Sequence, residues 1–144
     1  MTFNEEATLR AWRARWPWFW GLGLLLVCVS GCGRTRSHSD FLPAEDTARK
    51  ALETALTAWQ NGERVGKIDS ASPTIQVVDS KWRAGQKLQG YTILHVVPAD
   101  GPIRFAVRLT MKQPRAEQEV RYVVLGLDPL WIYREEDYKR ASGI

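Results

Sequence analysis

The feature that most constrains this chain is an apolar run near its N-terminus that ends too soon to cross a membrane. Residues 16–29 (WPWFWGLGLLLVCV) form a run of 14 residues, whereas a membrane-spanning helix needs about 20. Arg10, Arg13 and Arg15 precede it and small residues follow it, an order typical of a secretory signal peptide. We therefore expect residues 1–31 to be removed, which leaves 113 of the 144 residues for one domain.

The end of the run, Val29-Ser30-Gly31-Cys32, resembles the lipobox of bacterial lipoproteins. In that family the cysteine thiol receives a diacylglyceryl group, a peptidase cuts just before the cysteine, and the freed amine is usually acylated. The resemblance implies cleavage between Gly31 and Cys32, lipidation of Cys32, and a lipid anchor in the cell membrane or outer membrane with the domain on its non-cytoplasmic side. Val29 departs from the family's usual Leu. Gly33, where an Asp would retain the protein at the inner membrane, favours the outer membrane.

The alternative for this segment is an uncleaved signal anchor whose tryptophans form an interfacial belt. Its candidates are Trp12, Trp16, Trp18 and Trp20. If the leader is removed, Cys28 leaves with it and the mature chain keeps no free thiol, which suits an oxidising compartment.

The composition excludes several function classes. Residues 32–144 hold 17 basic and 14 acidic residues, without a basic cluster interleaved with aromatics, so we expect no nucleic-acid partner. The two cysteines and two histidines cannot complete a zinc site, and no phosphate loop is present. We expect no cofactor and no metal.

The mature chain predicts a tether, one helix and a series of strands. Residues 32–42 read as a lipidated cysteine and flexible tether, and apolar residues spaced i, i+3, i+4 over 43–61 predict an amphipathic helix. Short strands are expected at 75–78, 88–97, 104–112, 120–127 and 130–134, with turns between them. This pattern predicts an α+β domain over 43–134, with one N-terminal helix packed on a curled antiparallel sheet of four to five strands. Residues 135–144 read as a charged C-terminal tail.

This order of elements resembles the cystatin-like fold shared with the nuclear transport factor-like families, in which a long helix packs into a curled antiparallel sheet. Residues 77–82 and 128–138 also look like those of small bacterial lipoproteins without an assigned activity. Those cystatin-like families usually carry more than one helix, and this sequence offers one convincing helix.

The resemblance implies one candidate for chemistry, because enzymes on that fold often pair an Asp with a His or a Tyr at the open end of the sheet. Here strand alternation places His95 on one face with Tyr91 and Ile93. A general base needs an acid within reach, and the nearest acids, Asp79 and Asp100, lie in turns. We favour the reading of His95 as a solvated or hydrogen-bonded strand residue.

The strands over 104–112 and 120–127 offer a second candidate. If Lys112 pairs with Glu117, Arg108 faces Arg121, and directly opposed like charges are destabilising in a sheet. These arginines form either an anion or partner site, or a wet face balanced by Glu117 and Glu119; we favour the balanced face.

The same face also holds the apolar residues Val123, Leu125 and Leu127, so the tail or another chain is expected to cover part of it. The tryptophans Trp59, Trp82 and Trp131 are interpreted as core and rim packing.

Together these observations predict a membrane-anchored lipoprotein whose domain is a non-enzymatic binding or assembly module. Its partners would be membrane lipid through acylated Cys32 and an unidentified envelope protein. The alternative is a membrane-tethered enzyme or small-ligand binder that uses a pocket near His95 and Tyr91.

Overall fold

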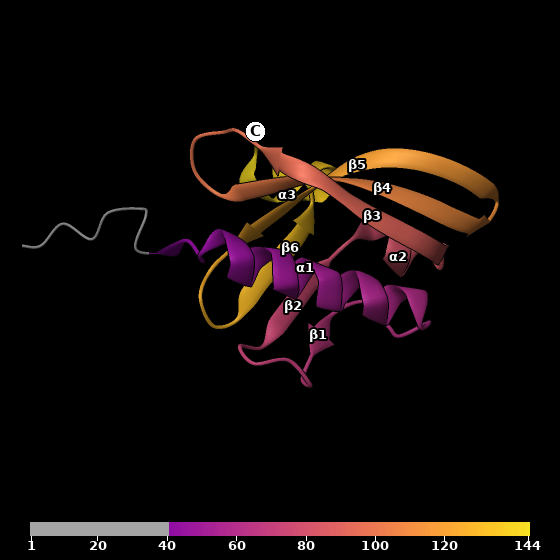
Figure 1. The fold of residues 1–144 in the computed structure, drawn as a ribbon, viewed down its shortest axis with the longest axis horizontal. Coiled ribbons are helices and arrows are strands. Elements are labelled where there is room, and N and C mark those ends of the chain that lie inside the picture. The colour runs from indigo at the N-terminus through magenta and orange to yellow at the C-terminus, as the bar shows by residue number, and fades with distance from the viewer. Residues whose placement is uncertain (1–40) are drawn as a thin grey trace, which may run out of the picture. The chain divides into compact units, whose positions relative to one another are not determined.

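A computed structural model describes residues 41–144 of the chain, which form an α+β domain with three helices and a mixed six-stranded sheet (Figure 1). The predicted signal peptide and the lipidation site at Cys32 lie outside the described residues, as does the tether up to residue 40. The elements in chain order are α1 (Glu45–Gln60), β1 (Lys67–Ile68), β2 (Ile75–Val78), α2 (Ser80–Arg83), β3 (Lys87–Val97), β4 (Ile103–Gln113), β5 (Arg115–Leu125), β6 (Leu130–Arg134) and α3 (Glu135–Ser142).

Helix α1 lies within the range 43–61 expected from the apolar spacing. Glu45 and Asp46 stand in its first turn, where carboxylates complement the helix dipole. The helix ends before Gly62, whose φ of 82° suits glycine. The predicted apolar stripe is buried throughout: Ala48, Ala51, Leu52, Ala55, Leu56 and Trp59.

The sheet differs from the expected four to five antiparallel strands. Its order is β1-β2-β6-β5-β4-β3, and β2 runs parallel to β6, with Ile75 beside Leu130 and Val78 beside Tyr133. The short strand β1 was not anticipated. A parallel pairing between segments so far apart in sequence involves no short turn between the two strands. The sequence pattern therefore could not predict the mixed sheet.

The β4–β5 register also differs from the expected one. Lys112 pairs with Arg115, so Arg108 faces Glu119 and Val107 faces Val120. The prediction that Arg108 faces Arg121 was therefore wrong, because the connection is shorter than the four-residue turn assumed. The shift is two residues, which leaves every side chain on its expected face. At Arg108 the observed register replaces a like-charge pair with an opposite-charge pair, whereas at Lys112 it places a like charge, Arg115, opposite.

Strand β3 carries a bulge that changes the face of His95. Ile93 pairs with Val107 and His95 pairs with Ala106, with the register shifting between them. The extra residue, Leu94, breaks the alternation that strand periodicity assumes. His95 consequently lies on the opposite face from Tyr91 and Ile93, contrary to prediction.

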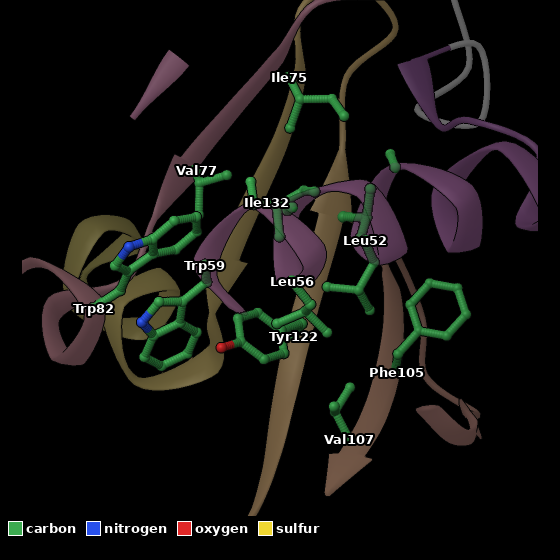
Figure 2. Packing of buried hydrophobic residues seen from close by; sticks show 14 of the residues in the cluster. Leu52, Leu56, Trp59, Ile75, Val77, Trp82, Phe105, Val107, Tyr122 and Ile132 are labelled. Atoms are coloured by element: carbon green, nitrogen blue, oxygen red, sulfur yellow. The ribbon is translucent and has the colours of Figure 1, made fainter. Parts of the chain in front are cut away.

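The hydrophobic core lies between α1 and the inner face of the sheet (Figure 2). Leu52, Leu56 and Trp59 of α1 point toward side chains from several strands, which are Ile75, Val77, Phe105, Val107, Tyr122 and Ile132. Leu56 is 1% exposed and Tyr122 is 1% exposed. This packing joins the antiparallel strands to the parallel pair in one core.

The segment expected as a charged tail forms α3, which contacts β5 and β6. Glu135 lies 3.9 Å from both Arg104 and Arg121, and Tyr138 packs edge-on against Tyr133. Val123, on the outer sheet face, is fully buried. Of the two expected covers for this face, the C-terminal segment is therefore the one observed.

Candidate functional site

The structure separates the four residues proposed as ligand or partner contacts. Tyr91 lies on the inner face, where its hydroxyl is 2.9 Å from Thr57 Oγ1 and donates to the Glu53 carbonyl at 3.3 Å. Arg108, Arg121 and the exposed His95 lie on the outer face. Tyr91 therefore fastens α1 to β3 and does not share a site with the other three.

Each outer-face arginine has a carboxylate neighbour. Arg108 faces Glu119 across the strands, and Arg121 lies 3.9 Å from Glu135. His95 stands in the same cross-strand row as Ala106 and Arg121. Glu119 is one of the two carboxylates expected to balance this face, whereas the other, Glu117, pairs with Thr110.

A better-formed site lies at the C-terminal end of α1, where a cleft of about 600 Å³ opens between that end, α2 and the start of β3. The residues that line this cleft come from segments widely separated in sequence. The lining residues are Trp59, Gln60, Gly62, Glu63, Arg64, Val65, Trp82, Arg83, Gly85, Gln86, Lys87, Leu88 and Lys112. We call this the tryptophan cleft.

Two stacked tryptophans form the apolar part of the tryptophan cleft. The rings of Trp59 and Trp82 are 5.3 Å apart with an angle of 11° between their planes, and both side chains are buried (Figure 2). Trp59 Nε1 donates to the Gln86 carbonyl at 2.7 Å, and Trp82 Nε1 donates to the Glu63 carbonyl at 2.8 Å. These bonds tie the loops on each side of the cleft to its floor, so the cleft is built on fixed side chains.

The tryptophan cleft is strongly basic. Arg64, Arg83, Lys87 and Lys112 line it together with one carboxylate, Glu63. Residues 41–144 hold 15 basic and 13 acidic residues, a net charge of +2. The cleft alone contributes +3, so the rest of the described domain is slightly acidic. Among residues 41–144 no carboxylate lies close enough to any of the four cations to form an ion pair.

Gln86 adds a polar group to the same wall. Its side-chain oxygen Oε1 is buried and has no hydrogen-bond partner among residues 41–144. A buried acceptor without a donor costs about 1–3 kcal/mol.

A buried polar network supports the cleft from beneath. Asp79 caps α2, because its Oδ1 accepts hydrogen bonds from the backbone N–H of Lys81 at 2.8 Å and of Trp82 at 3.0 Å. Its Oδ2 accepts from the Tyr122 hydroxyl at 2.7 Å and lies 3.8 Å from Arg134 Nη1. The carboxylate thus fixes the short helix that presents Trp82 to the cleft.

Tyr122 stays protonated in this network. Burial, followed by the neighbouring Asp79 carboxylate, raises the pKa of its phenol well above 10.0. Arg134 also donates from Nε to Glu136 at 2.9 Å and from Nη2 to Gln118 at 3.3 Å. In this network the neutral Tyr122 hydroxyl donates to Asp79, and the Arg134 cation lies beside Asp79 and Glu136. Such an arrangement suits a structural role.

The tryptophan cleft could not be predicted from the sequence. Trp59 and Trp82 are predicted to be packing residues, and they are buried, but no sequence pattern places Lys87 and Lys112 beside them. Asp79, one of the two acids nearest to His95 in sequence, bonds instead to the backbone of α2 and to Tyr122. One sequence signal could have indicated the role of Asp79: Trp82 follows it by three residues, which is the spacing at which an N-cap side chain accepts a backbone hydrogen bond.

Residues 41–144 contain no group of three or more His, Cys, Asp or Glu side chains placed to hold a metal ion. No helix in this same range is long and apolar enough to span a membrane. Comparisons with protein-family models, with curated proteins and with solved structures find no match to this chain.

Proposed function

We propose that this chain is a lipid-anchored protein of the bacterial cell envelope, and that its folded domain is a non-enzymatic binding module. The proposal of a lipid anchor rests on the lipobox-like Val29-Ser30-Gly31-Cys32. It also rests on the basic residues and the apolar run that precede this motif. Attachment would come from acyl chains at Cys32, at about 0.8 kcal/mol for each buried methylene. The domain would face away from the cytoplasm.

The observation that carries the binding role is the tryptophan cleft. Its lining residues offer cations, an amide and indole surfaces, which recognise ligands by charge and apolar contact. They include one carboxylate, Glu63, and no His, Ser or Cys, so the cleft lacks the serine or cysteine nucleophile with a histidine base that is common in hydrolytic sites. We therefore propose binding at this site in place of catalysis.

The tryptophan cleft and the first described residue lie at opposite ends of α1. The backbone carbonyl of Phe41, the first described residue, accepts a hydrogen bond from Gly126 N at 3.2 Å, before the start of α1. The tryptophan cleft is lined by Trp59 and Gln60 at the other end of α1, and a helix of 16 residues is about 24 Å long. We propose that a partner in the envelope reaches the domain through this cleft.

We also propose that the domain is related to the cystatin-like folds. The support is the packing of one helix, α1, on the face of the antiparallel strands β3 to β6. The parallel strand β2 and the C-terminal helix α3 would be additions to that arrangement.

The anchor is tested by intact-mass measurement of the membrane fraction. We expect a wild-type species that begins at Cys32 and carries added acyl mass. Cys32→Ala should leave the full-length precursor, whereas Cys28→Ala, the matched control inside the apolar run, should be processed normally. An unmodified full-length chain from wild-type cells would overturn the anchor.

A further inference from the structure

We propose that the tryptophan cleft binds an acidic, extended polypeptide segment of a partner protein. This inference rests on the proposed function only in treating the cleft as a binding site. It adds the chemical class of the ligand: carboxylate side chains for the cations of the cleft and an apolar side chain for its apolar lining, which includes Val65 beside the tryptophans.

The charge distribution favours a chain of negative groups over a single compact anion. The four cations come from separate segments: Arg64 follows α1, Arg83 ends α2, Lys87 begins β3 and Lys112 lies near the end of β4. They are spread around a cleft of about 600 Å³. A phosphate-sized ion is usually held by donors that converge on one point, whereas acidic side chains along a peptide can meet dispersed cations one at a time.

The tryptophans disfavour a nucleic acid as the ligand. Proteins that bind single strands stack bases on free aromatic faces. Trp59 and Trp82 are stacked on each other and only 2% and 6% exposed, so neither ring leaves a free face for a base. The apolar lining of the cleft, which also includes Val65, instead suits an aliphatic or aromatic peptide side chain.

The shape of the site disfavours a lipid surface. Lipid headgroups form a broad flat layer, whereas these cations line a concave cleft at the far end of α1 from Phe41.

The test is a titration of the full chain in detergent with a synthetic peptide that has a run of glutamates on each side of one phenylalanine. Binding is measured by calorimetry and by tryptophan fluorescence, since Trp59 and Trp82 line the site. Lys87→Glu with Lys112→Glu reverses two cleft charges. Lys50→Glu with Lys139→Glu makes the same change in net charge at exposed positions outside the cleft and is the control.

We expect the cleft double variant to weaken peptide binding by about tenfold or more, because two attractions become repulsions, and the control to change it by less than about twofold. Wild-type binding should weaken with added salt. Circular dichroism should show both double variants folded, since all four lysines are exposed.

Several results would overturn the inference. Equal losses in the cleft and control variants would mean attraction to net charge alone. Competition by inorganic phosphate at the same concentration of charge would indicate a simple anion site. Tighter binding of a single-stranded oligonucleotide, or of phosphatidylglycerol vesicles, with loss in the cleft variant would identify those ligands instead.

A peptide with glutamine in place of glutamate separates this inference from the proposed function. If the glutamine peptide binds as well as the acidic one, the cleft is a binding site but the acidic class is wrong. If neither peptide binds, both the ligand class and the cleft's role in binding a peptide fail. The intact-mass result at Cys32 is independent of all these outcomes.

Discussion

Replacing Asp79 with alanine should be among the most destabilising single substitutions in this domain. One carboxylate, 1% exposed, caps α2 through Lys81 and Trp82, accepts from the Tyr122 hydroxyl, and lies 3.8 Å from Arg134 Nη1. Alanine removes all of these interactions and leaves the Tyr122 hydroxyl and the Arg134 side chain buried without this partner.

The expected loss in the free energy of unfolding is about 2–4 kcal/mol from the helix cap and the Tyr122 hydroxyl together, with a smaller addition from Arg134. Loss of a helix cap costs about 1 kcal/mol. A buried Tyr122 hydroxyl without its acceptor adds about 1–3 kcal/mol. Arg134 adds a smaller amount, because its side chain is 4% exposed but keeps Glu136 at 2.9 Å, so its charge is not left wholly unpaired.

The assay is urea unfolding followed by tryptophan fluorescence, in which a stability loss appears as a lower midpoint at an unchanged slope. The control is Asp69→Ala, because the Asp69 side chain is 74% exposed and only pairs with Lys67; we expect no measurable change. A double-mutant cycle of Asp79→Ala with Tyr122→Phe should show a coupling of at least about 0.5 kcal/mol. A loss below about 1 kcal/mol for Asp79→Ala, or additive effects in the cycle, would refute the reasoning.

Three further predictions concern the core, alkaline stability and strand register. Leu56→Ala should lower the free energy of unfolding by about 2–5 kcal/mol because it opens a cavity in the core, whereas Leu127→Ala, at a side chain 52% exposed, should change it little; equal midpoints in urea would contradict the packing. Burial raises the pKa of Tyr122 above its unfolded value of 10.0. Its contribution to the free energy of unfolding is therefore fully present below pH 10 and is lost as the pH rises further, by about 1.4 kcal/mol per pH unit. Tyr122→Phe should flatten this decline, and an unchanged pH profile of the variant would contradict the prediction. Arg108→Glu should lower the thermal midpoint by placing two carboxylates opposite each other, and adding Glu119→Arg should restore it; if the second change gives no recovery, the observed pairing is wrong.

The sequence by itself determined the helices and strands that depend on patterns among neighbouring residues. The i, i+3, i+4 spacing of apolar residues predicted α1, and alternation predicted most strands and their buried faces. The error in the β4–β5 register shows the limit of that information. A shift of two residues keeps every side chain on its face, so the hydrophobic pattern cannot detect it, and only the length of the connection settles whether Arg108 meets Arg121 or Glu119.

Other features were decided only by the tertiary structure. The parallel pairing of β2 with β6 joins segments with no local connection, the bulge after Ile93 turns His95 to the other face, and α3 is a polar segment that becomes a helix against the sheet. The tryptophan cleft belongs to this group: Trp59, Trp82, Lys87 and Lys112 are unremarkable in sequence and converge only when α1, α2 and two strands pack together. Periodicity reports which face of an element is buried, but it carries no information about which distant element packs against that face.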